Sequence, residues 1–414
     1  MSFLVFLREN ARWIAGGFLL TFFSSFGQTF FISLSAGDIR REYELSHGDF
    51  GMLYMVATLA SAFTLPRFGQ IVDRYSPRNV ALIIIPMLAA ATISMALSHS
   101  LIVLVITIYM LRLFGQGMMT HNALTAMARW FSAQRGRAVS VATLGHNTGE
   151  AVLPLIFVAV AGYLGWRNAW FVAAGVLILV ALPLISGLIW QEREPRSTDP
   201  EPRKAPARDW TRAEVIRDPL FYLLLLGVMA PGFIGTTIFF HQVYLVELRG
   251  WSLEVFASSF TFMASMTVIF ALVAGQLVDR FSATALLPSF LFPLAAACLA
   301  LASFDAQWSA FAFMGLLGIS YGFSSTLFGA VWPEVYGLRH LGSIRALTVA
   351  IMVFATAMGP GLTGYLIDVG ISYPLQIAFM GLYCLGACGL MLYVSRKLAR
   401  RSLQSEMASA TSQP

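Results

Sequence analysis

Two related stretches of sequence decide the fold: GQIVDRYSPR at residues 69–78 and GQLVDRFS at residues 275–282. Each is a short charged segment between long apolar runs, and each begins with a glycine, which permits close backbone approach at a helix end. Charged residues make up only 12% of the chain, whereas a soluble domain has about 25%. A charged turn that occurs twice in so apolar a chain indicates two copies of one structural plan.

The apolar runs around these turns are long enough to cross a membrane. The chain has 414 residues, and 57% of them are hydrophobic. A run of about 20 residues spans a hydrocarbon core of about 30 Å as a helix. The runs are continuously apolar, which excludes the alternating strands of an outer-membrane barrel. We therefore predict an all-α membrane protein with twelve transmembrane helices, at residues 12–36, 48–68, 79–98, 101–130, 138–161, 168–190, 219–246, 254–275, 284–303, 308–332, 344–367 and 374–395.

The distribution of lysine and arginine predicts which side of the membrane each loop faces. If the amino terminus is cytoplasmic, only Arg40, Arg41, Arg167 and Arg249 of the 27 lysines and arginines fall on the opposite side. Such an asymmetry is the positive-inside pattern. We expect a multi-pass protein of the inner (plasma) membrane with both termini in the cytoplasm. Basic residues facing anionic lipid then explain the net charge of +6 without a nucleic-acid partner.

The longest polar stretch divides the chain into two halves. It is rich in proline and in charges of both signs, as expected of a solvated linker. Aligning the two charged turns also aligns Phe50 with Phe256 and Pro154 with Pro360, which indicates an internal duplication. The expected parts are an amino-terminal six-helix bundle at 1–190, a cytoplasmic linker at 191–218, and a carboxy-terminal six-helix bundle with a short cytoplasmic tail at 219–414.

Six plus six spans, a central cytoplasmic linker and the repeated pattern G-x-x-x-D-R resemble the major facilitator superfamily. The resemblance covers essentially the whole chain and implies a fold of two pseudo-symmetric bundles, in which spans 1, 4, 7 and 10 line a central cavity. No nucleophile elbow, dinucleotide fingerprint or phosphate-binding loop occurs in a suitable context. We therefore expect no enzymatic activity and no cofactor.

The two charged turns are predicted to act as gates. A carboxylate in such a turn can meet the positive amino-terminal end of a neighbouring helix, and the resemblance implies that these neighbours belong to spans 11 and 5. Such contacts would exist only while the cytoplasmic side is closed, so they would favour one of two states. The alternative is that these residues are ordinary loop charges. The predicted gating residues are Gly69, Asp73, Arg74, Arg78, Gly275, Asp279 and Arg280.

One cation and one acid lie away from the membrane interfaces: Arg112 in span 4 and Glu150 in span 5. Ionisable residues at that depth are costly and by default functional. His146 lies on the same helix face as Glu150, one turn earlier, and Glu150 is the expected proton carrier. Spans 4 and 5 run antiparallel, which places Arg112 about 9 Å further toward the outside than Glu150. A direct ion pair and a separate role of Arg112 toward the substrate both remain open.

Other polar side chains in the spans complete the candidate site. The alternative for each of them is a hydrogen bond between membrane helices. A metal site of His121, His146 and Glu150 has suitable ligands, but His121 and His146 do not face each other well, and we expect no metal. The predicted substrate-binding and proton-binding residues are Arg112, Glu150, His146, His121, Asn147, Gln28, His241, Tyr244 and Tyr321.

Three stretches point to one branch of the superfamily. RWFSAQRGRAVSVATLGHNTGEAVLP at 129–154, GWRNAWF at 165–171 and YGLRHLGSIRA at 336–346 are similar to the monocarboxylate and oxalate/formate transporter group. This similarity implies a carboxylate or another organic anion as the cargo. Members of that group usually place a cation in span 8, but residues 254–275 contain no lysine or arginine. Arg112 would then have to supply the cation at membrane depth.

We therefore expect a secondary transporter that moves a small organic solute, most readily an organic anion, by proton-coupled alternating access. No nucleotide-binding motif is present, so an ion gradient would drive transport. The alternatives are a proton/drug antiporter that exports amphipathic compounds, and a membrane sensor that does not transport. The expected partners are the small-molecule substrate, the proton and the lipid bilayer, and we expect a monomer. The direction of transport remains open.

Overall fold

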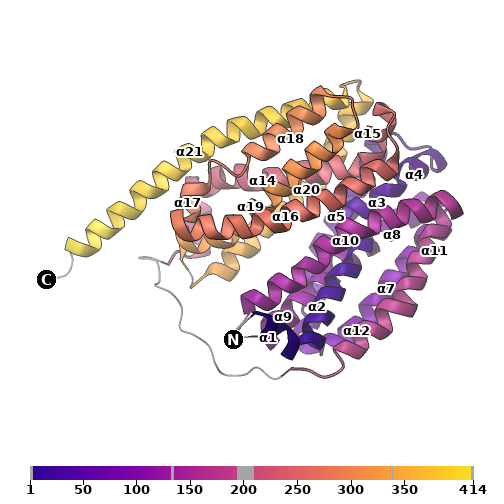
Figure 1. Cartoon of the computed structure of the whole chain (residues 1–414), viewed down its shortest axis with the longest axis horizontal. Helices are drawn as coiled ribbons and strands as arrows, with labels where there is room; N and C mark the ends of the chain where they lie inside the picture. The colour runs from indigo at the N-terminus through magenta and orange to yellow at the C-terminus, as the bar shows by residue number, and fades with distance from the viewer. Residues whose placement is uncertain (1–2, 132–134, 194–208, 338, 412–414) are drawn as a thin grey trace. The chain divides into compact units, whose positions relative to one another are not determined.

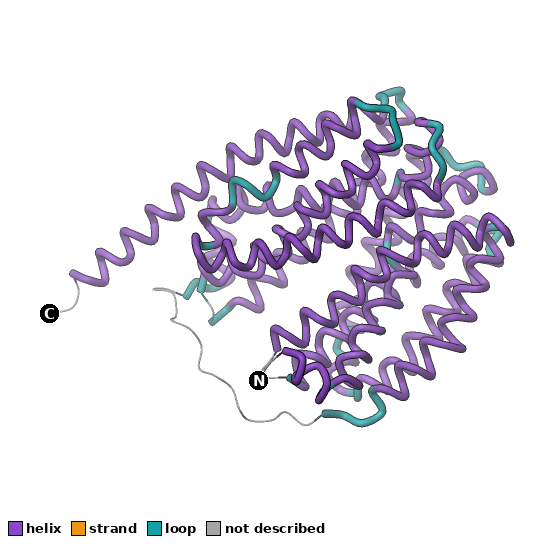
Figure 2. The backbone as a smooth tube through the Cα atoms, viewed as in Figure 1, coloured by secondary structure: helices purple, strands orange, loops and turns teal. Residues whose placement is uncertain are grey.

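The structure is a computed structural model, and it describes residues 3–131, 135–193, 209–337 and 339–411. Throughout these residues the chain forms helices joined by turns and loops, with no strand (Figures 1 and 2). The predicted all-α class is confirmed.

The helices of the first half are α1 (Phe3–Glu9), α2 (Ala11–Phe23), η1 (Ser24–Gly27), α3 (Thr29–Ile32), η2 (Ser33–Ser35), α4 (Ala36–Glu42), α5 (His47–Phe68), α6 (Ile71–Arg74), α7 (Pro77–Leu97), α8 (Leu101–Met110), η3 (Leu111–Met119), α9 (Thr120–Trp130), α10 (Arg135–Leu164), α11 (Trp166–Val176), η4 (Leu177–Ala181) and α12 (Leu182–Leu188). Among these, η1 and η2 are 3-10 helices, and η3 and η4 are π-helices. The helices of the second half are α13 (Arg212–Arg217), α14 (Pro219–Phe240), α15 (Gln242–Arg249), α16 (Leu253–Phe281), α17 (Ala283–Leu286), α18 (Phe292–Ser303), α19 (Trp308–Tyr336), α20 (Leu341–Asp368) and α21 (Tyr373–Thr411).

These helices account for the predicted membrane spans. Among the described residues, ten helical segments are long and apolar enough to cross a membrane. An eleventh is a bent pair, Ala11–Gly27 and Thr29–Glu42, with an angle of 45° between its parts. The remaining predicted span, 284–303, corresponds to α17 and α18, of which α18 has 12 residues. The chain therefore has the helices of a multi-pass membrane protein.

Local sequence signals start several of these helices. Ser46 precedes α5 and forms a capping box with Asp49, in which each side chain bonds the other residue's backbone N–H. Ser76 caps α7, and Pro77 occupies the first helical position, where no donor is needed. The end of the first charged turn is thus the start signal of the third span.

The chain forms two compact units, which do not follow the order of the sequence strictly. The first unit contains Met1–Glu201 together with two segments of the second half, Phe239–Thr261 and Pro360–Asp368. In this unit α10 lies along α2, and α11 lies along α7 (Figure 1). Gln242 ties the first of these segments to the unit, because its amide nitrogen donates to Phe30 O at 2.9 Å and to Ser33 Oγ at 2.8 Å.

The second unit contains Pro202–Ile238, Phe262–Gly359 and Val369–Pro414. Helix α18 packs against both α19 and α21 in this unit. The predicted division of the chain at residues 191–218 follows the duplication of the sequence, and it stays a prediction.

A buried ion pair anchors the start of α14 in the second unit. Asp218 is 4% exposed, and its carboxylate accepts hydrogen bonds from Arg401 Nη1 at 2.7 Å and Nη2 at 2.9 Å. Tyr336 OH donates to the same carboxylate at 3.1 Å, and the Arg401 guanidinium lies 5.0 Å from the ring centre of Trp210. This cluster joins the end of the linker to α19 and α21.

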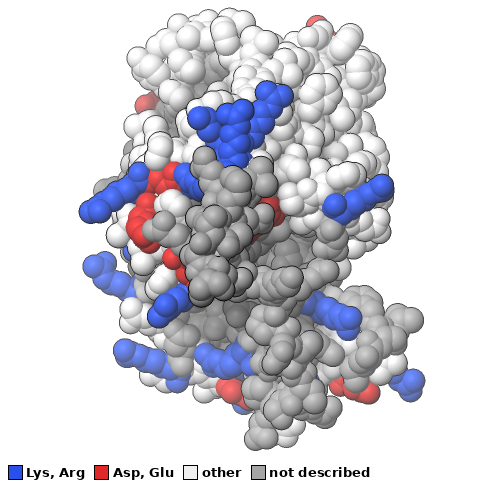
Figure 3. All heavy atoms as spheres, turned by 90° about the vertical axis from the view of Figure 1, so that its left-hand side faces the viewer, with Lys and Arg blue, Asp and Glu red and all other residues white. Residues whose placement is uncertain are grey.

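Lysines and arginines are spread over the face of the molecule shown in Figure 3, with fewer acidic groups among them. Loops rich in arginine and lysine are the ones that the positive-inside rule assigns to the cytoplasm. The side of the membrane that each loop faces stays a prediction.

Candidate functional site

The first membrane span is interrupted in its middle. Between α2 and α3 the chain forms the short 3-10 helix η1, and Gln28 adopts an extended conformation with φ −86° and ψ 154°. Irregular backbone at membrane depth is tolerated only where protein or a water-filled cavity surrounds it. Ser24, Ser25 and Gly27 in this break are buried. The break is therefore an interior feature of the first unit.

The fourth span is also irregular, and the two irregular segments contact each other. Residues Leu111–Met119 form the π-helix η3, a form that is rare and frequent at functional sites. Gly27 and Gly115 allow the contact: a Cβ on Gly27 would lie 2.1 Å from Leu111 O and 2.7 Å from Gly115 Cα. Two distorted membrane helices thus meet backbone to backbone.

Arg112 lies in this contact and is 5% exposed. Its Nη1 donates to Thr29 Oγ1 at 3.1 Å and to Gly27 O at 3.4 Å. Its guanidinium lies 5.5 Å from the ring centre of Tyr54, whose hydroxyl donates to Thr29 Oγ1 at 2.8 Å. Each of these partners is neutral.

The described residues therefore do not balance the charge of Arg112. Among the described residues no carboxylate forms an ion pair with it, and its buried Nε has no hydrogen-bond partner. A buried cation without a counter-ion is costly. The site is suited to a ligand that brings a negative charge.

Glu150 lies on α10 and is 7% exposed. Among the described residues it has no hydrogen-bond or ion-pair partner, so the direct pair with Arg112 is not formed. The preceding Gly149 packs against the broken first span, because a Cβ there would lie 2.2 Å from Ser25 Oγ and 2.8 Å from Phe22 O. Glu150 is thus a buried acid on a helix that touches the break.

The other predicted residues of spans 4 and 5 divide between two places. His146 is half-buried, with its ring centre 6.1 Å from that of Phe30, and Asn147 is half-buried beside it. His121 is exposed and lies beside the end of α5, where a Cβ on Gly69 would be 3.2 Å from its Nε2. No group of three potential metal ligands occurs among the described residues.

Gln28 is 8% exposed and lies in the break itself. Tyr321 lies on α19 in the second unit, where its hydroxyl packs against α14 at Gly235: a Cβ on that glycine would be 1.8 Å from the oxygen. The structure therefore places Gln28 with Arg112 in the first unit, and Tyr321 in the second.

His241 and Tyr244 belong to a second polar cluster of the first unit, together with His47 and Arg40. Arg40 Nη1 lies 2.6 Å from His47 Nε2. The ring of His47 is centred 4.1 Å from that of Tyr244 and 6.2 Å from that of His241. These four residues line one small pocket, so His241 and Tyr244 have partners of their own that do not include Arg112.

The predicted gating residues are partly described. Gly69 ends α5, Arg74 is exposed, and Arg78 stacks on Trp190 with 5.6 Å between its guanidinium and the ring centre. Arg280 is exposed and lies over the ring of Phe281, and no described atom lies within 4 Å of a Cβ built on Gly275. The side chains of Asp73 and Asp279 lie outside the described residues, so the contacts expected of them stay predictions.

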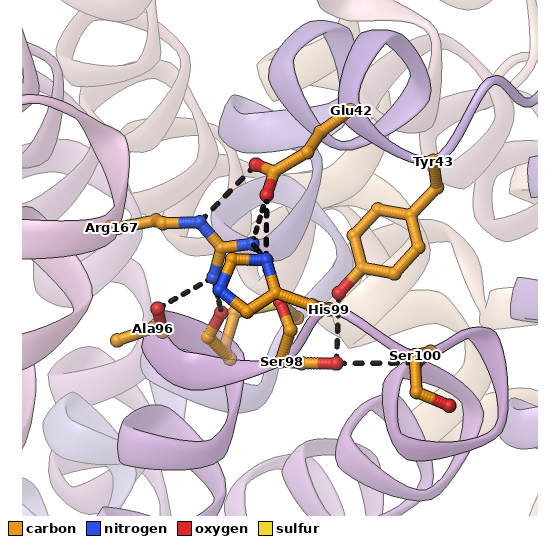
Figure 4. Close-up of polar contacts among 8 residues, drawn as sticks. Glu42, Tyr43, Ala96, Ser98, His99, Ser100 and Arg167 are labelled. Atoms are coloured by element: carbon orange, nitrogen blue, oxygen red, sulfur yellow. Dashed lines mark hydrogen bonds and ion pairs between the residues drawn. The ribbon is translucent and has the colours of Figure 1, made fainter.

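A further cluster, which the sequence did not reveal, surrounds Arg167 at the start of α11 (Figure 4). Its guanidinium pairs with Glu42 and donates to Ala96 O at 2.6 Å and Ser98 O at 2.5 Å. His99 Nδ1 lies 3.1 Å from the same carboxylate. The last carbonyls of a helix have no partner within it, so Arg167 satisfies the end of α7 and joins three segments. We interpret this cluster as structural.

Comparison with known families gives one match that covers most of the chain. The model of a family described as the Major Facilitator Superfamily matches residues 17–360. Solved structures show the same fold: that of a bacterial homologue of the human lysosomal transporter Spinster, inward-facing and unoccupied, has a TM-score of 0.73 and 16% identity, with 94% of this chain and 98% of that chain covered.

Three curated proteins have related sequences. A probable sulfoacetate transporter, SauU, from Cupriavidus necator is 24% identical over 41% of this chain and 39% of its own length. A phosphoglycerate transporter protein from Salmonella typhimurium is 23% identical over 81% of this chain and 74% of its own length. A fosmidomycin resistance protein from Escherichia coli is 26% identical over 52% of each chain. The chain thus spans about two fifths of the first relative and half of the third.

Proposed function

Because this chain belongs to the Major Facilitator Superfamily and is a membrane transporter rather than an enzyme, we propose that its cargo is a small organic anion and that protons drive its transport. The protein would work by alternating access, in which a site near the membrane midplane opens to one side at a time. We further propose the inner membrane as its location, cytoplasmic termini, and a monomer as the working form.

Arg112 is the observation that carries the proposal. It is a buried cation whose partners in the described part of the chain are a threonine hydroxyl, a backbone carbonyl and an aromatic ring. The guanidinium matches the planar geometry of a carboxylate and the oxygens of a phosphate. A negatively charged cargo would supply the counter-ion that the protein lacks, and the cost of the unpaired charge would favour binding of such a cargo.

The names of two relatives support the same class of cargo. Sulfoacetate and phosphoglycerate, named for two of the related transporters, are small molecules with two acidic groups each. The relative named for fosmidomycin resistance favours export of a drug-like compound as the second candidate function.

Glu150 supports the proposed proton coupling. It is a buried acid with no partner among the described residues, on a helix that contacts the broken first span. An acid in that setting can bind a proton without losing an ion pair. Its position on α10, separate from the partners of Arg112, allows the proton and the anion to bind different groups.

Uptake by the purified protein in liposomes tests the proposal. With an imposed pH gradient, the wild type should accumulate a labelled member of a panel of small carboxylates, sulfonates and phosphate esters. Arg112→Gln should lower that uptake by about 10- to 100-fold, the loss expected for a hydrogen-bonded charge pair.

Arg41→Gln is the matched control, because Arg41 is an exposed arginine of the same unit whose partner is Asp38 on α4. It should retain most of the uptake. Wild-type uptake by Arg112→Gln, or extrusion of lipophilic dyes with no anion uptake, would contradict the proposal.

A further inference from the structure

The last residue of α20 is an aspartate, Asp368, at a place where a carboxylate is unfavourable. The carboxyl-terminal end of a helix carries a partial negative charge. The carboxylate of Asp368 binds the opposite end of another helix: it accepts hydrogen bonds from Gly48 N at 2.7 Å and from His47 N at 3.2 Å. These are the first two residues of α5, so the positive end of α5 compensates the charge.

Glycines let α5 and α20 approach each other at this place. A Cβ on Gly48 would lie 2.5 Å from Asp368 Oδ2, and a Cβ on Gly51 would lie 2.5 Å from Pro360 O. A Cβ on Gly364 would lie 2.3 Å from a backbone oxygen at the start of α5. Residues 360, 364 and 368 share one face of α20, so the last turns of that face are fitted to the first turns of α5.

The bond to Asp368 is not needed to form α5. Ser46 and Asp49 already make a complete capping box at the start of that helix. His47 is half-buried and Gly48 is buried, and both amide groups have the carboxylate of Asp368 as their partner. The carboxylate of Asp368 therefore joins two segments that are more than 300 residues apart in the sequence.

Charged groups from two further helices surround this contact. Arg40 on α4 lies 2.6 Å from the ring of His47, and it lies 3.9 Å from Glu247 on α15. The end of α20 thus forms part of a polar group to which α4, α5 and α15 also contribute.

We propose that Asp368, with Gly48, Gly51 and Gly364, forms a latch that keeps the non-cytoplasmic side of the transporter closed. In the proposed topology α5 begins and α20 ends on that side, so the two helices must separate there when the site opens outward. The latch uses the chemistry predicted for the cytoplasmic turns, a carboxylate on a helix amino terminus with glycines at the contact. The inference rests on the proposed alternating access and topology, but not on the identity of the cargo.

Thiol labelling of the full-length transporter tests the latch. In a background without Cys298, Cys384 and Cys388, Ala36→Cys provides a reporter that is buried and lines the small pocket beside His47. A membrane-impermeant maleimide is added from the non-cytoplasmic side without cargo. Asp368→Asn should raise the labelling rate about three- to tenfold, because losing a charge–dipole contact moves the population toward the open state.

Asp49→Asn is the matched control, since it removes the same charge from the capping box of α5 without touching α20. In this control the reporter cysteine should be labelled at the wild-type rate. In Gly48→Ala it should be labelled faster than in the wild type, because the added Cβ would lie 2.5 Å from Asp368 Oδ2. Size-exclusion profiles in detergent identify variants that have not folded. The labelling rates are then compared among the folded variants. A wild-type labelling rate in Asp368→Asn, or an equal rise in Asp49→Asn, would overturn the latch and leave the anion proposal intact.

Discussion

Arg112 and Glu150 are both buried charges, but their surroundings differ. Arg112 is bound by neutral oxygens and an aromatic ring, whereas Glu150 has no partner among the described residues. Burying a cation costs less free energy when the cation is hydrogen-bonded, because its hydrogen bonds replace some of the lost hydration. The acid can remain neutral instead. This difference leads us to propose anion binding for Arg112 and proton binding for Glu150.

Glu150→Gln should therefore separate proton coupling from cargo binding. Glutamine has nearly the same shape as protonated glutamate but cannot release a proton. We expect the variant to lose accumulation driven by a pH gradient, while exchange of labelled for unlabelled cargo continues at a rate within about threefold of the wild type. Both rates can be measured in liposomes that contain the purified protein.

Glu254→Gln serves as the control, because Glu254 is an exposed acid at the start of α16. It should accumulate cargo normally. Full accumulation by Glu150→Gln would remove Glu150 from the coupling mechanism.

The rarity of charge in membrane spans made Arg112 and Glu150 identifiable from the sequence. Thr29, Tyr54 and Gly27 were not identified as partners of Arg112, because hydroxyls and glycines occur throughout the spans and serve mainly in helix packing. His241 and Tyr244, two of the predicted substrate-binding residues, have their rings beside that of His47, in a small pocket that Arg40 also lines. Which helices meet at a given depth depends on packing that a single sequence does not show.

At the scale of elements, the broken first span and the π-helical fourth span define the candidate site. The sequence predicts both as continuous apolar helices, since neither contains a proline near the irregular segment. The irregular segments coincide instead with the close contact of Gly27 and Gly115, which is a tertiary contact. In contrast, the starts of α5 and α7 follow from Ser46, Asp49 and Ser76, because caps act locally.

The ion pair between Asp218 and Arg401 yields a prediction about stability. Burial raises the pKa of the Asp218 carboxyl, but the hydrogen bonds and charge of Arg401 outweigh it and hold the pKa below its ordinary value. An acid whose pKa is depressed in the folded state stabilises that state fully above its unfolded pKa of about 3.9. This stabilisation is lost as the pH falls through the folded pKa.

Asp218→Asn should accordingly lower the free energy of unfolding by about 1–3 kcal/mol at pH 7, below the full value for a buried pair because Arg401 is 35% exposed. Thermal unfolding in detergent would show a lower midpoint for the variant. The difference from the wild type should persist at pH 5 and shrink only in more acidic buffers. A difference that disappears already between pH 7 and pH 5 would contradict this account of the pair.

At the scale of the whole molecule, the duplicated turn and the apolar runs were sufficient to predict the fold class and the family. Both depend on composition and repetition, which a single sequence displays directly. The allocation of Phe239–Thr261 and Pro360–Asp368 to the first unit could not be predicted in this way. It depends on long-range contacts such as those of Gln242 with Phe30 and Ser33.

The most direct test of the central claim is ligand-dependent thermal stability of the purified transporter. A ligand that binds the folded state raises its stability by about 2.7 kcal/mol at a concentration of 100 Kd. The panel of small organic anions to be tested includes sulfoacetate and phosphoglycerate. We predict that one or more anions of the panel raise the unfolding temperature of the wild type by a few degrees. Arg112→Gln should show no such rise, and neutral analogues should have no effect on either protein. An equal rise in the wild type and in Arg112→Gln, or a response to neutral compounds alone, would contradict the claim that Arg112 binds an anionic cargo.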